Sequence, residues 1–262
     1  MALVDTGLLV RYYIDEAASG QGPAEVLDNS IAPDFDLAIT YDTTDLNYNE
    51  ISGNRGLENT NVDTDARAVK DINDTSDKVR DNIHGAQKAT LEAVVRADSF
   101  NAGGGRCFGI NVGTTDGSFM LRGATSSFQF AAEFGAGVNP QVYRTWTDGI
   151  ASRSVFHVVV DTTQATADDR IKVYRDGTLI TPTVNDNPAL NDTIELDAGS
   201  TMFMFNRGTV SFARSMDGVL FYAALYSSAF TSGNVTTNHN ILTSDDDTPA
   251  APPAARRPVT VY

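Results

Sequence analysis

The feature that most constrains the fold of this chain is residues 219–226, an uninterrupted run of apolar and aromatic side chains near its C-terminal end. A strand with one face in water alternates apolar and polar residues, and this run does not alternate. The small residues Ala223 and Ala224 within the run fit the same buried environment. We therefore predict a strand that is packed between two sheets rather than half exposed, which requires a β-sandwich around it.

Length and composition support one such domain followed by a tail. The chain has 262 residues and is 41% hydrophobic, which is enough for a sizeable core and argues against disorder. Its 21 glycines, with many Asp, Asn, Ser and Thr residues, indicate frequent turns between short strands. Cys107 is the only cysteine, which excludes an intrachain disulfide and a metal site built from cysteines.

Charge and the lack of long apolar runs exclude several classes of partner. The formal net charge of −15 would repel phosphate backbones and anionic membrane surfaces, so we expect no nucleic acid partner. No apolar run approaches the ~20 residues that a membrane span requires, so we expect no membrane insertion. The N-terminal residues do not resemble a signal peptide, and the chain is expected to carry no leader.

Strand patterns recur along the chain. Residues 7–16 are rich in β-branched and aromatic side chains, and residues 89–97 alternate with period two. Residues 156–161 read as a buried strand, and residues 170–181 as a hairpin. Asp176-Gly177 supplies the two positive-φ positions of a type I′ turn in that hairpin.

Polar segments interrupt this pattern. Residues 58–81 are mostly Asp, Asn, Thr and Lys, which predicts loops with at most a helical turn near residues 77–81. Nowhere does the sequence show a convincing long amphipathic helix.

Two motifs resemble those of a known superfamily. Arg214-Ser-Met-Asp-Gly218, continued by aromatic and apolar residues to Ser232, resembles the last core strand of the concanavalin A-like and laminin G-like jelly rolls. The strand His157-Val-Val-Val-Asp161, followed by Val173-Tyr-Arg-Asp-Gly177, resembles the middle strands of the same family. The resemblance implies an all-β fold, a two-sheet antiparallel jelly-roll β-sandwich. We assign residues 1–243 to this sandwich and residues 244–262 to a Pro-rich C-terminal arm.

The catalytic motifs of enzymes with this fold are missing. Glycosidases of the family carry Glu-x-Asp-x-(x)-Glu on one strand, and only Glu195-Leu-Asp197 comes close, without the second glutamate. His84, His157 and His239 stand in unrelated contexts, and we expect His157 to be packed within its strand. The chain is therefore expected not to be an enzyme, with a glycoside hydrolase or polysaccharide lyase as the enzymatic alternative.

Aromatic residues provide the candidate sugar site. Trp146 is the sole tryptophan, lies beside Tyr143 and Arg144, and precedes a turn at residues 148–149. An aromatic ring at an exposed rim can stack on a sugar, so we predict these three residues as a glycan site; the alternative is that they fill the core or a strand edge.

Calcium is the cofactor that the resemblance implies. Two Asp-rich loops, residues 59–65 and 71–77, supply the oxygen ligands that calcium prefers, although neither loop fits an EF-hand. The alternative is that both are solvated turns. The candidate ligands are Asp63, Asp65, Asp71, Asp74 and Asp77.

The arm ends in four β-prone residues, Val259, Thr260, Val261 and Tyr262. A Pro-rich spacer could carry them to a sheet edge of another copy or of another particle protein, or they could form an unbound terminus. The sequence thus predicts a non-catalytic lectin-like surface protein of a phage or virus particle, for decoration or adhesion, with a surface glycan as ligand. The alternative is a carbohydrate-binding module of a secreted bacterial protein. The expected location is the virion surface or the extracellular space.

Overall fold

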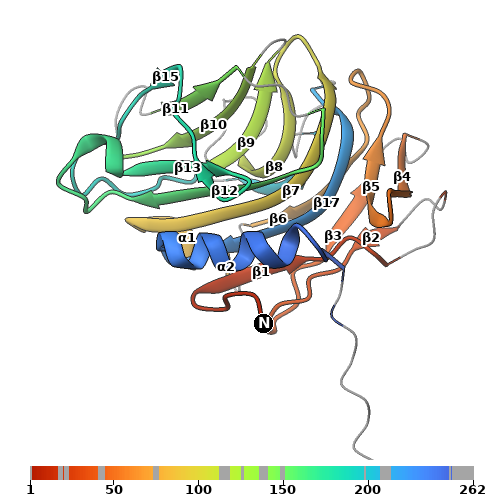
Figure 1. The fold of residues 1–262 in the computed structure, drawn as a ribbon, viewed down its shortest axis with the longest axis horizontal. Coiled ribbons are helices and arrows are strands. Elements are labelled where there is room, and N and C mark those ends of the chain that lie inside the picture. The colour runs from red at the N-terminus through yellow and green to blue at the C-terminus, as the bar shows by residue number, and fades with distance from the viewer. Residues whose placement is uncertain are drawn as a thin grey trace, which may run out of the picture.

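The computed structural model of the chain describes residues 2–16, 20, 24–40, 45–72, 77–111, 119–124, 127–135, 141–147, 151–197, 199–206, 214–247 and 249. Its described strands form two antiparallel sheets packed face to face, which confirms the predicted two-sheet β-sandwich (Figure 1). No helix in the described residues is long and apolar enough to cross a membrane.

The first sheet, sheet A, has eight described strands. Their spatial order is β14 (Thr178–Leu179), β13 (Ile171–Arg175), β12 (Ser154–Asp161), β7 (Lys88–Phe100), β17 (Met216–Tyr226), β5 (Asn54–Asn59) and β4 (Leu46–Ile51), with β1 (Leu8–Tyr12) also paired to β17.

The second sheet, sheet B, has nine described strands. Their spatial order is β15 (Val184–Asn185), β11 (Gln141–Trp146), β10 (Ser127–Glu133), β9 (Phe119–Ala124), β8 (Gly105–Asn111), β16 (Thr201–Met204), β6 (Arg67–Asp71), β3 (Leu37–Thr40) and β2 (Glu25–Val26).

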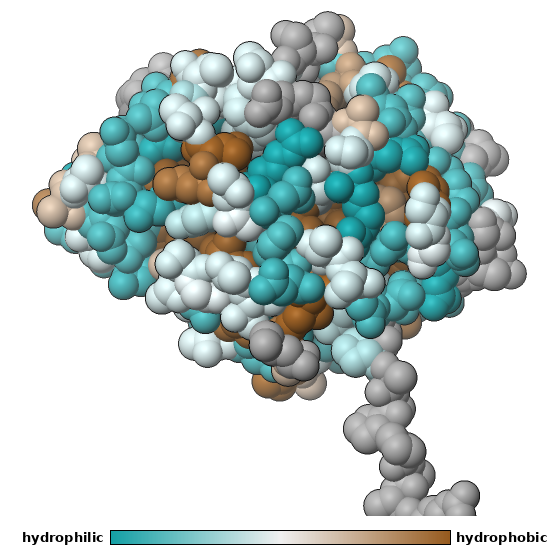
Figure 2. Space-filling view, in the orientation of Figure 1, coloured by the Kyte–Doolittle hydropathy of each residue, from teal (hydrophilic) through white to brown (hydrophobic). Residues whose placement is uncertain are grey.

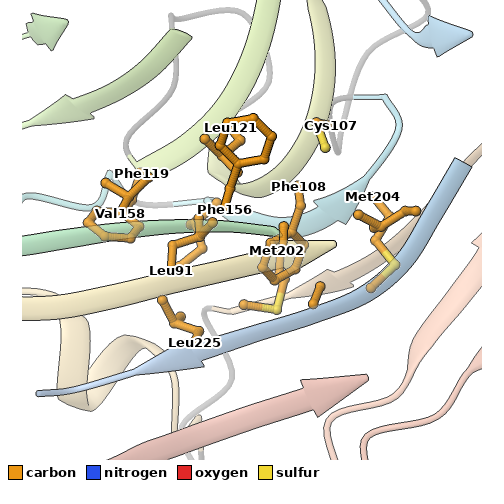
Figure 3. Close-up of a cluster of buried hydrophobic side chains, with 14 of the residues drawn as sticks. Leu91, Cys107, Phe108, Phe119, Leu121, Phe156, Val158, Met202, Met204 and Leu225 are labelled. Atoms are coloured by element: carbon orange, nitrogen blue, oxygen red, sulfur yellow. The ribbon is translucent and has the colours of Figure 1, made fainter. Parts of the chain in front are cut away.

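The main core lies between the facing sides of the two sheets. Figure 3 shows part of it, where Leu91 and Leu225 of sheet A lie near Phe108 and Met202 of sheet B. Cys107 is buried in the same core, and this burial raises the pKa of its thiol. The single cysteine is therefore a packing residue.

A second apolar layer covers the other face of sheet A. Helix α2 (Ser232–Leu242) lies over that face, and its Val235 and Leu242 pack with Val219 and Phe221 of β17 (Figure 1). The predicted burial of β17 is confirmed, but only one covering layer is a sheet: sheet B lies on one side and helix α2 on the other.

Helix α2 was not predicted, because its sequence is rich in Asn and Thr, which are poor helix formers, and its apolar stripe is weak. Local capping stabilises its start. The Thr231 hydroxyl accepts from the Asn234 backbone N–H, and the Asn234 side chain accepts from the Thr231 N–H. Packing against sheet A supplies the remaining stability.

The loop prediction for residues 58–81 is wrong in part. Residues 67–71 form β6, which lies inside sheet B between β16 and β3. Arg67 is fully buried, so a charged residue occupies a position where a strand pattern would show an apolar one. The helical turn is found at α1 (Arg80–Ile83).

The predicted Asp-Gly turn has the expected backbone, and a second Asp-Gly pair forms a bulge. Asp176 and Gly177 have φ values of 50° and 74°, which confirms the type I′ hairpin. Gly218 sits at a register shift of β17 with φ 151°, where a Cβ would lie 2.1 Å from the Arg96 carbonyl oxygen. Only glycine fits this bulge, which explains the Asp-Gly pair of the strand motif.

The sandwich keeps contacts beyond the predicted boundary at residue 243. Asp246 is buried, and its Oδ2 accepts from Arg153 at 3.1 Å from Nε and at 2.5 Å from Nη2. Asp247 lies 3.8 Å from Arg55 of β5. The predicted docking residues Val259, Thr260, Val261 and Tyr262 fall outside the described residues.

A further short helix, the 3-10 helix η1 (Ala167–Asp169), lies between β12 and β13. It belongs to the end of the sandwich where β14 and β15 form one edge of each sheet.

Candidate functional site

Strand β11 divides the predicted glycan trio between two faces of sheet B. Successive side chains of a strand point to opposite faces, so Tyr143 faces away from Arg144 and Trp146. Arg144 pairs with Phe130, and Trp146 pairs with Phe128, both of which belong to the core. The three residues therefore do not form one surface.

Trp146 is only 2% exposed. Its ring centroid lies 5.8 Å from that of Phe156, in a stacked arrangement, and 5.1 Å from that of Phe128, in an edge contact. The prediction that this ring lies at an exposed rim is wrong, because its position in the strand directs it into the core. No face of the ring is open to a sugar.

Tyr143 lies on the outer face of sheet B within a polar row. The Arg122 guanidinium lies over its ring, 5.1 Å from the centroid. Arg122 donates to Gln129 at 2.6 Å, and Gln129 donates to Thr145 at 2.7 Å. This row, Arg122, Gln129, Tyr143 and Thr145, is called the outer-face row below.

Arg144 instead reaches a hollow at the end of the sandwich, between the edge strands β14 and β15. We call this hollow of about 280 Å³ the edge cleft. Figure 2 shows a hydrophobic patch, bordered by hydrophilic residues, over the part of the surface where Figure 1 draws β13. The lining of the edge cleft combines apolar and polar side chains, including Arg144, Asp168, Lys172, Leu179, Pro182 and Asn185.

A hydrogen-bond network fixes the polar side of the edge cleft. The buried guanidinium of Arg144 donates to the Ile171 carbonyl at 3.3 Å, and also to the Asp186 carbonyl and the Asn187 side chain. The amides of Asn185 and Asn187 donate to one oxygen of Asp168, at 2.7 Å and 3.0 Å. We call Arg144, Asp168, Asn185 and Asn187 the edge network.

This geometry shifts the pKa values of Asp168 and Arg144. Hydrogen bonds from Asn187 and Asn185, with a smaller effect of the Arg144 charge, hold the pKa of Asp168 below its usual value. Burial lowers the pKa of Arg144, and the nearby Asp168 and Asp186 partly oppose this effect. Asp168 is therefore a carboxylate at neutral pH, exposed to solvent at the mouth of the cleft.

A second hollow, of about 470 Å³, adjoins the edge cleft and shares Asn185 with it. Its wall is the segment 185–192, which is tethered at several points. Thr162 donates its hydroxyl to the Asp192 carbonyl at 2.6 Å, and Arg170 donates to the Pro188 carbonyl at 2.8 Å. These bonds hold the segment in one conformation, so its side chains are organised before a ligand arrives.

The predicted calcium ligands do not form a described metal site. Asp63 accepts from the Asn101 side chain at 2.6 Å, and Asp77 accepts from the backbone of Val79 and Arg80 at the start of α1. Burial raises the pKa of Asp77 to about 6. Asp65 is half-buried and Asp71 exposed, while Asp74 lies outside the described residues. Within the described ranges, no three acidic, His or Cys side chains gather closely enough to hold a metal.

The Glu195-Leu-Asp197 segment is not part of a described strand. Only Ile194 before it forms an isolated bridge, with Phe134. Glu195 lies 3.6 Å from Nδ1 of His84 and accepts from the Thr193 hydroxyl at 3.0 Å. The two carboxylates are thus not displayed side by side by a strand, as the glycosidase motif requires.

Sequence reasoning missed a buried polar cluster beneath α2. Glu92 of β7 is fully buried and lies 2.8 Å from Nε2 of His157, which confirms that His157 is packed. Tyr222 and Tyr226 donate to Glu92 at 3.1 Å and 2.9 Å, and Asn238 of α2 donates to it at 2.9 Å. The cluster is closed to solvent, so it joins the helix to the sheet and offers no site to a ligand.

No protein-family model matches this sequence, and no curated protein sequence matches it. Solved structures do share the fold. Trypanosoma rangeli sialidase in complex with sialic acid is 17% identical, over 95% of this chain and 35% of that chain, with a TM-score of 0.61.

The binding domain of botulinum neurotoxin DC shares the fold as well. Its complex with rat synaptotagmin II is 8% identical, over 89% of this chain and 51% of that chain, with a TM-score of 0.58. Its complex with SialylT is 10% identical, over 90% of this chain and 51% of that chain, with a TM-score of 0.58. The chain spans about a third of the sialidase and about half of the toxin domain, and identities this low show the β-sandwich fold alone.

Proposed function

We propose that this protein is a non-catalytic, lectin-like jelly roll of the concanavalin A-like and laminin G-like kind, which binds glycan at the edge cleft. The observation that carries the proposal is the edge network, which fixes carboxylate and amide groups beside exposed apolar side chains. The comparisons support the proposal, since two of the structures with this fold are complexes with sialic acid and with SialylT.

The edge cleft has the chemistry that sugar recognition needs. Sugar hydroxyls both donate and accept hydrogen bonds, and Asp168 accepts while the amides of Asn185 and Asn187 can donate and accept. Leu179, which is 53% exposed, and Pro182 offer an apolar surface for the C–H face of a ring. Because the segment 185–192 is already tethered, binding would cost little ordering of the protein.

The same residues do not suit glycoside hydrolysis. A general acid needs a raised pKa, whereas the pKa of Asp168 is lowered. Asp169 is paired with Lys172 at 2.9 Å. No histidine or cysteine belongs to the described lining of the cleft. Recognition without catalysis is therefore the function that the edge cleft supports.

The proposed setting is the surface of a phage or virus particle, or otherwise the extracellular space. The Pro-rich arm of residues 244–262 supports this setting, because it suits contact with other copies or other particle proteins. A carbohydrate-binding module of a secreted bacterial protein is the alternative.

A glycan array tests the proposal, with the parent protein and two single variants. Asn185→Ala removes an amide from the edge cleft without opening the core, so we expect about a tenfold loss of affinity for the bound glycan, because one hydrogen bond is lost and Asp168 loses one of the two amides that position it. The matched variant Tyr143→Ala alters the outer-face row and should bind like the parent.

The melting temperatures of both variants serve as the folding control. If Tyr143→Ala loses binding and Asn185→Ala keeps it, the site lies on the outer face of sheet B. If the parent binds no glycan on a broad array, the proposed function is wrong.

A further inference from the structure

We propose that the edge cleft selects neutral glycans and rejects sialylated, uronate or sulfated ones. This inference rests on the proposed function and adds the class of ligand. Structures with the same fold are complexes with sialic acid and with SialylT, so the fold gives no reason to expect this selectivity. The charges of the edge cleft and of the adjoining hollow supply the reason.

Carboxylates outnumber cations along the two hollows. The described lining has four carboxylates and two cations, namely Asp168, Asp169, Asp186 and Asp192 against Arg144 and Lys172. The whole chain carries a net charge of −15, so no excess of positive charge elsewhere in the chain offsets this local excess of negative charge.

Both cations of the edge cleft are already engaged. Arg144 directs its guanidinium to the carbonyls of Ile171 and Asp186 and to the Asn187 side chain. Lys172 lies 2.9 Å from Asp169. A ligand carboxylate would have to share a cation that already has protein partners, and recognition of an anion in proteins relies on such donors.

Asp168 makes an anionic ligand still less favourable. Its Oδ1 accepts two amide hydrogen bonds, and its side chain is exposed at the mouth of the cleft. A ligand carboxylate that enters there approaches a like charge, whereas a neutral hydroxyl donates a hydrogen bond to it. The same carboxylate thus attracts a neutral sugar and repels an acidic one.

The test compares lactose-terminated and 3′-sialyllactose-terminated probes, together with neutral and carboxylated polysaccharides, at low and high salt on the full chain. We expect the neutral member of each pair to bind at least about tenfold more tightly at low salt, with a smaller difference at high salt because salt screens the repulsion.

Asp168→Asn is the discriminating variant. Asparagine keeps an oxygen that accepts from Asn185 and Asn187 but removes the charge. The affinity ratio of sialylated to neutral probe should therefore rise severalfold. The matched control Glu50→Gln removes one exposed charge from β4, at the opposite edge of sheet A, and should leave the ratio unchanged.

Three outcomes separate this inference from the function on which it rests. Preference for neutral probes that Asp168→Asn weakens supports the inference. Equal or tighter binding of sialylated probes overturns it while leaving glycan recognition intact, and so does a ratio that Glu50→Gln changes as much as Asp168→Asn. Binding of no probe of either kind overturns the proposed function and the inference together.

Discussion

Replacing Glu92 by glutamine tests whether the cluster beneath α2 holds the helix to sheet A. Three side chains donate to the buried carboxylate, Tyr226 and Asn238 at 2.9 Å and Tyr222 at 3.1 Å, and Nε2 of His157 lies 2.8 Å from it. In Glu92→Gln the charge is lost and one of the two oxygens becomes an NH₂ group, which cannot accept the hydrogen bonds that this oxygen receives.

The magnitude follows from the burial of these groups. Removing one partner from a buried, hydrogen-bonded charge pair costs about 3 to 5 kcal/mol, because the remaining groups stay buried without a partner. For a protein of this size, 1 kcal/mol shifts Tm by about 2 to 4 °C, so Tm should fall by about 6 to 20 °C. Urea and thermal denaturation, followed by circular dichroism, measure both quantities.

The stability lost in Glu92→Gln should become smaller as the pH falls. Burial tends to raise the pKa of Glu92, but the hydrogen bond and charge of His157, with hydrogen bonds from Asn238 and Tyr226, hold it below the usual value of 4.5. A carboxyl with a lowered pKa stabilises the fold above its unfolded pKa, and this contribution is lost as the pH falls through the folded pKa. The difference between parent and Glu92→Gln should therefore be full at neutral pH and shrink below about pH 4.5.

Glu50→Gln is the matched control, since Glu50 is exposed on β4 of the same sheet. Its stability should stay within about 0.5 kcal/mol of the parent. A Tm for Glu92→Gln within 2 °C of the parent at neutral pH, or a loss that does not change with pH, would refute the reasoning.

Three further outcomes are expected. Phe221→Ala should cost about 3 to 5 kcal/mol in urea denaturation, because the ring is buried under α2 and the Arg153 guanidinium lies 5.4 Å from its centroid; a Tm within a degree or two of the parent would contradict this. If the predicted Asp loops hold calcium, the ion binds the folded state, so calcium would raise Tm and EDTA would reverse the rise; identical curves would remove the calcium prediction. Deleting residues 248–262 should leave Tm almost unchanged, since Asp246 and Asp247 keep their contacts, while weakening association in light scattering; unchanged association would show that the arm takes no part in it.

The sandwich could be predicted because its signals are local. A few neighbouring residues are enough to indicate each element: the alternation along β7, the apolar run of β17 and the Asp-Gly pair of the turn at Asp176-Gly177. Strand β6 could not be predicted in this way, because its buried Arg67 gives the segment a polar appearance. Helix α2 was also hidden, since its stability comes from the cap at Thr231 and from packing, and neither appears as an apolar stripe.

The candidate site shows a different limit of sequence reasoning. Tyr143, Arg144 and Trp146 are neighbours in sequence, and the strand separates them because adjacent side chains face opposite ways. Asn185 and Asn187 join Arg144 and Asp168 only because β15 pairs with β11 and η1 lies at the same end of the sandwich. These contacts depend on the pairing of segments that are distant in sequence, and no motif in the sequence indicates that pairing.

The layer arrangement leaves the edge between β14 and β15 uncovered by helix α2. Helix α2 covers the outer face of sheet A, and the cluster around Glu92 fixes it there. Edge strands expose unpaired backbone groups and tend to pair with other chains, but β14 and β15 are only two residues long, which limits such pairing. Exposed Leu179 and Val184, beside the polar groups of the edge network, therefore suit a small ligand better than an added strand. The proposed site thus lies where β14 and β15 end the two sheets, beside the segment 185–192 that Thr162 and Arg170 already tether.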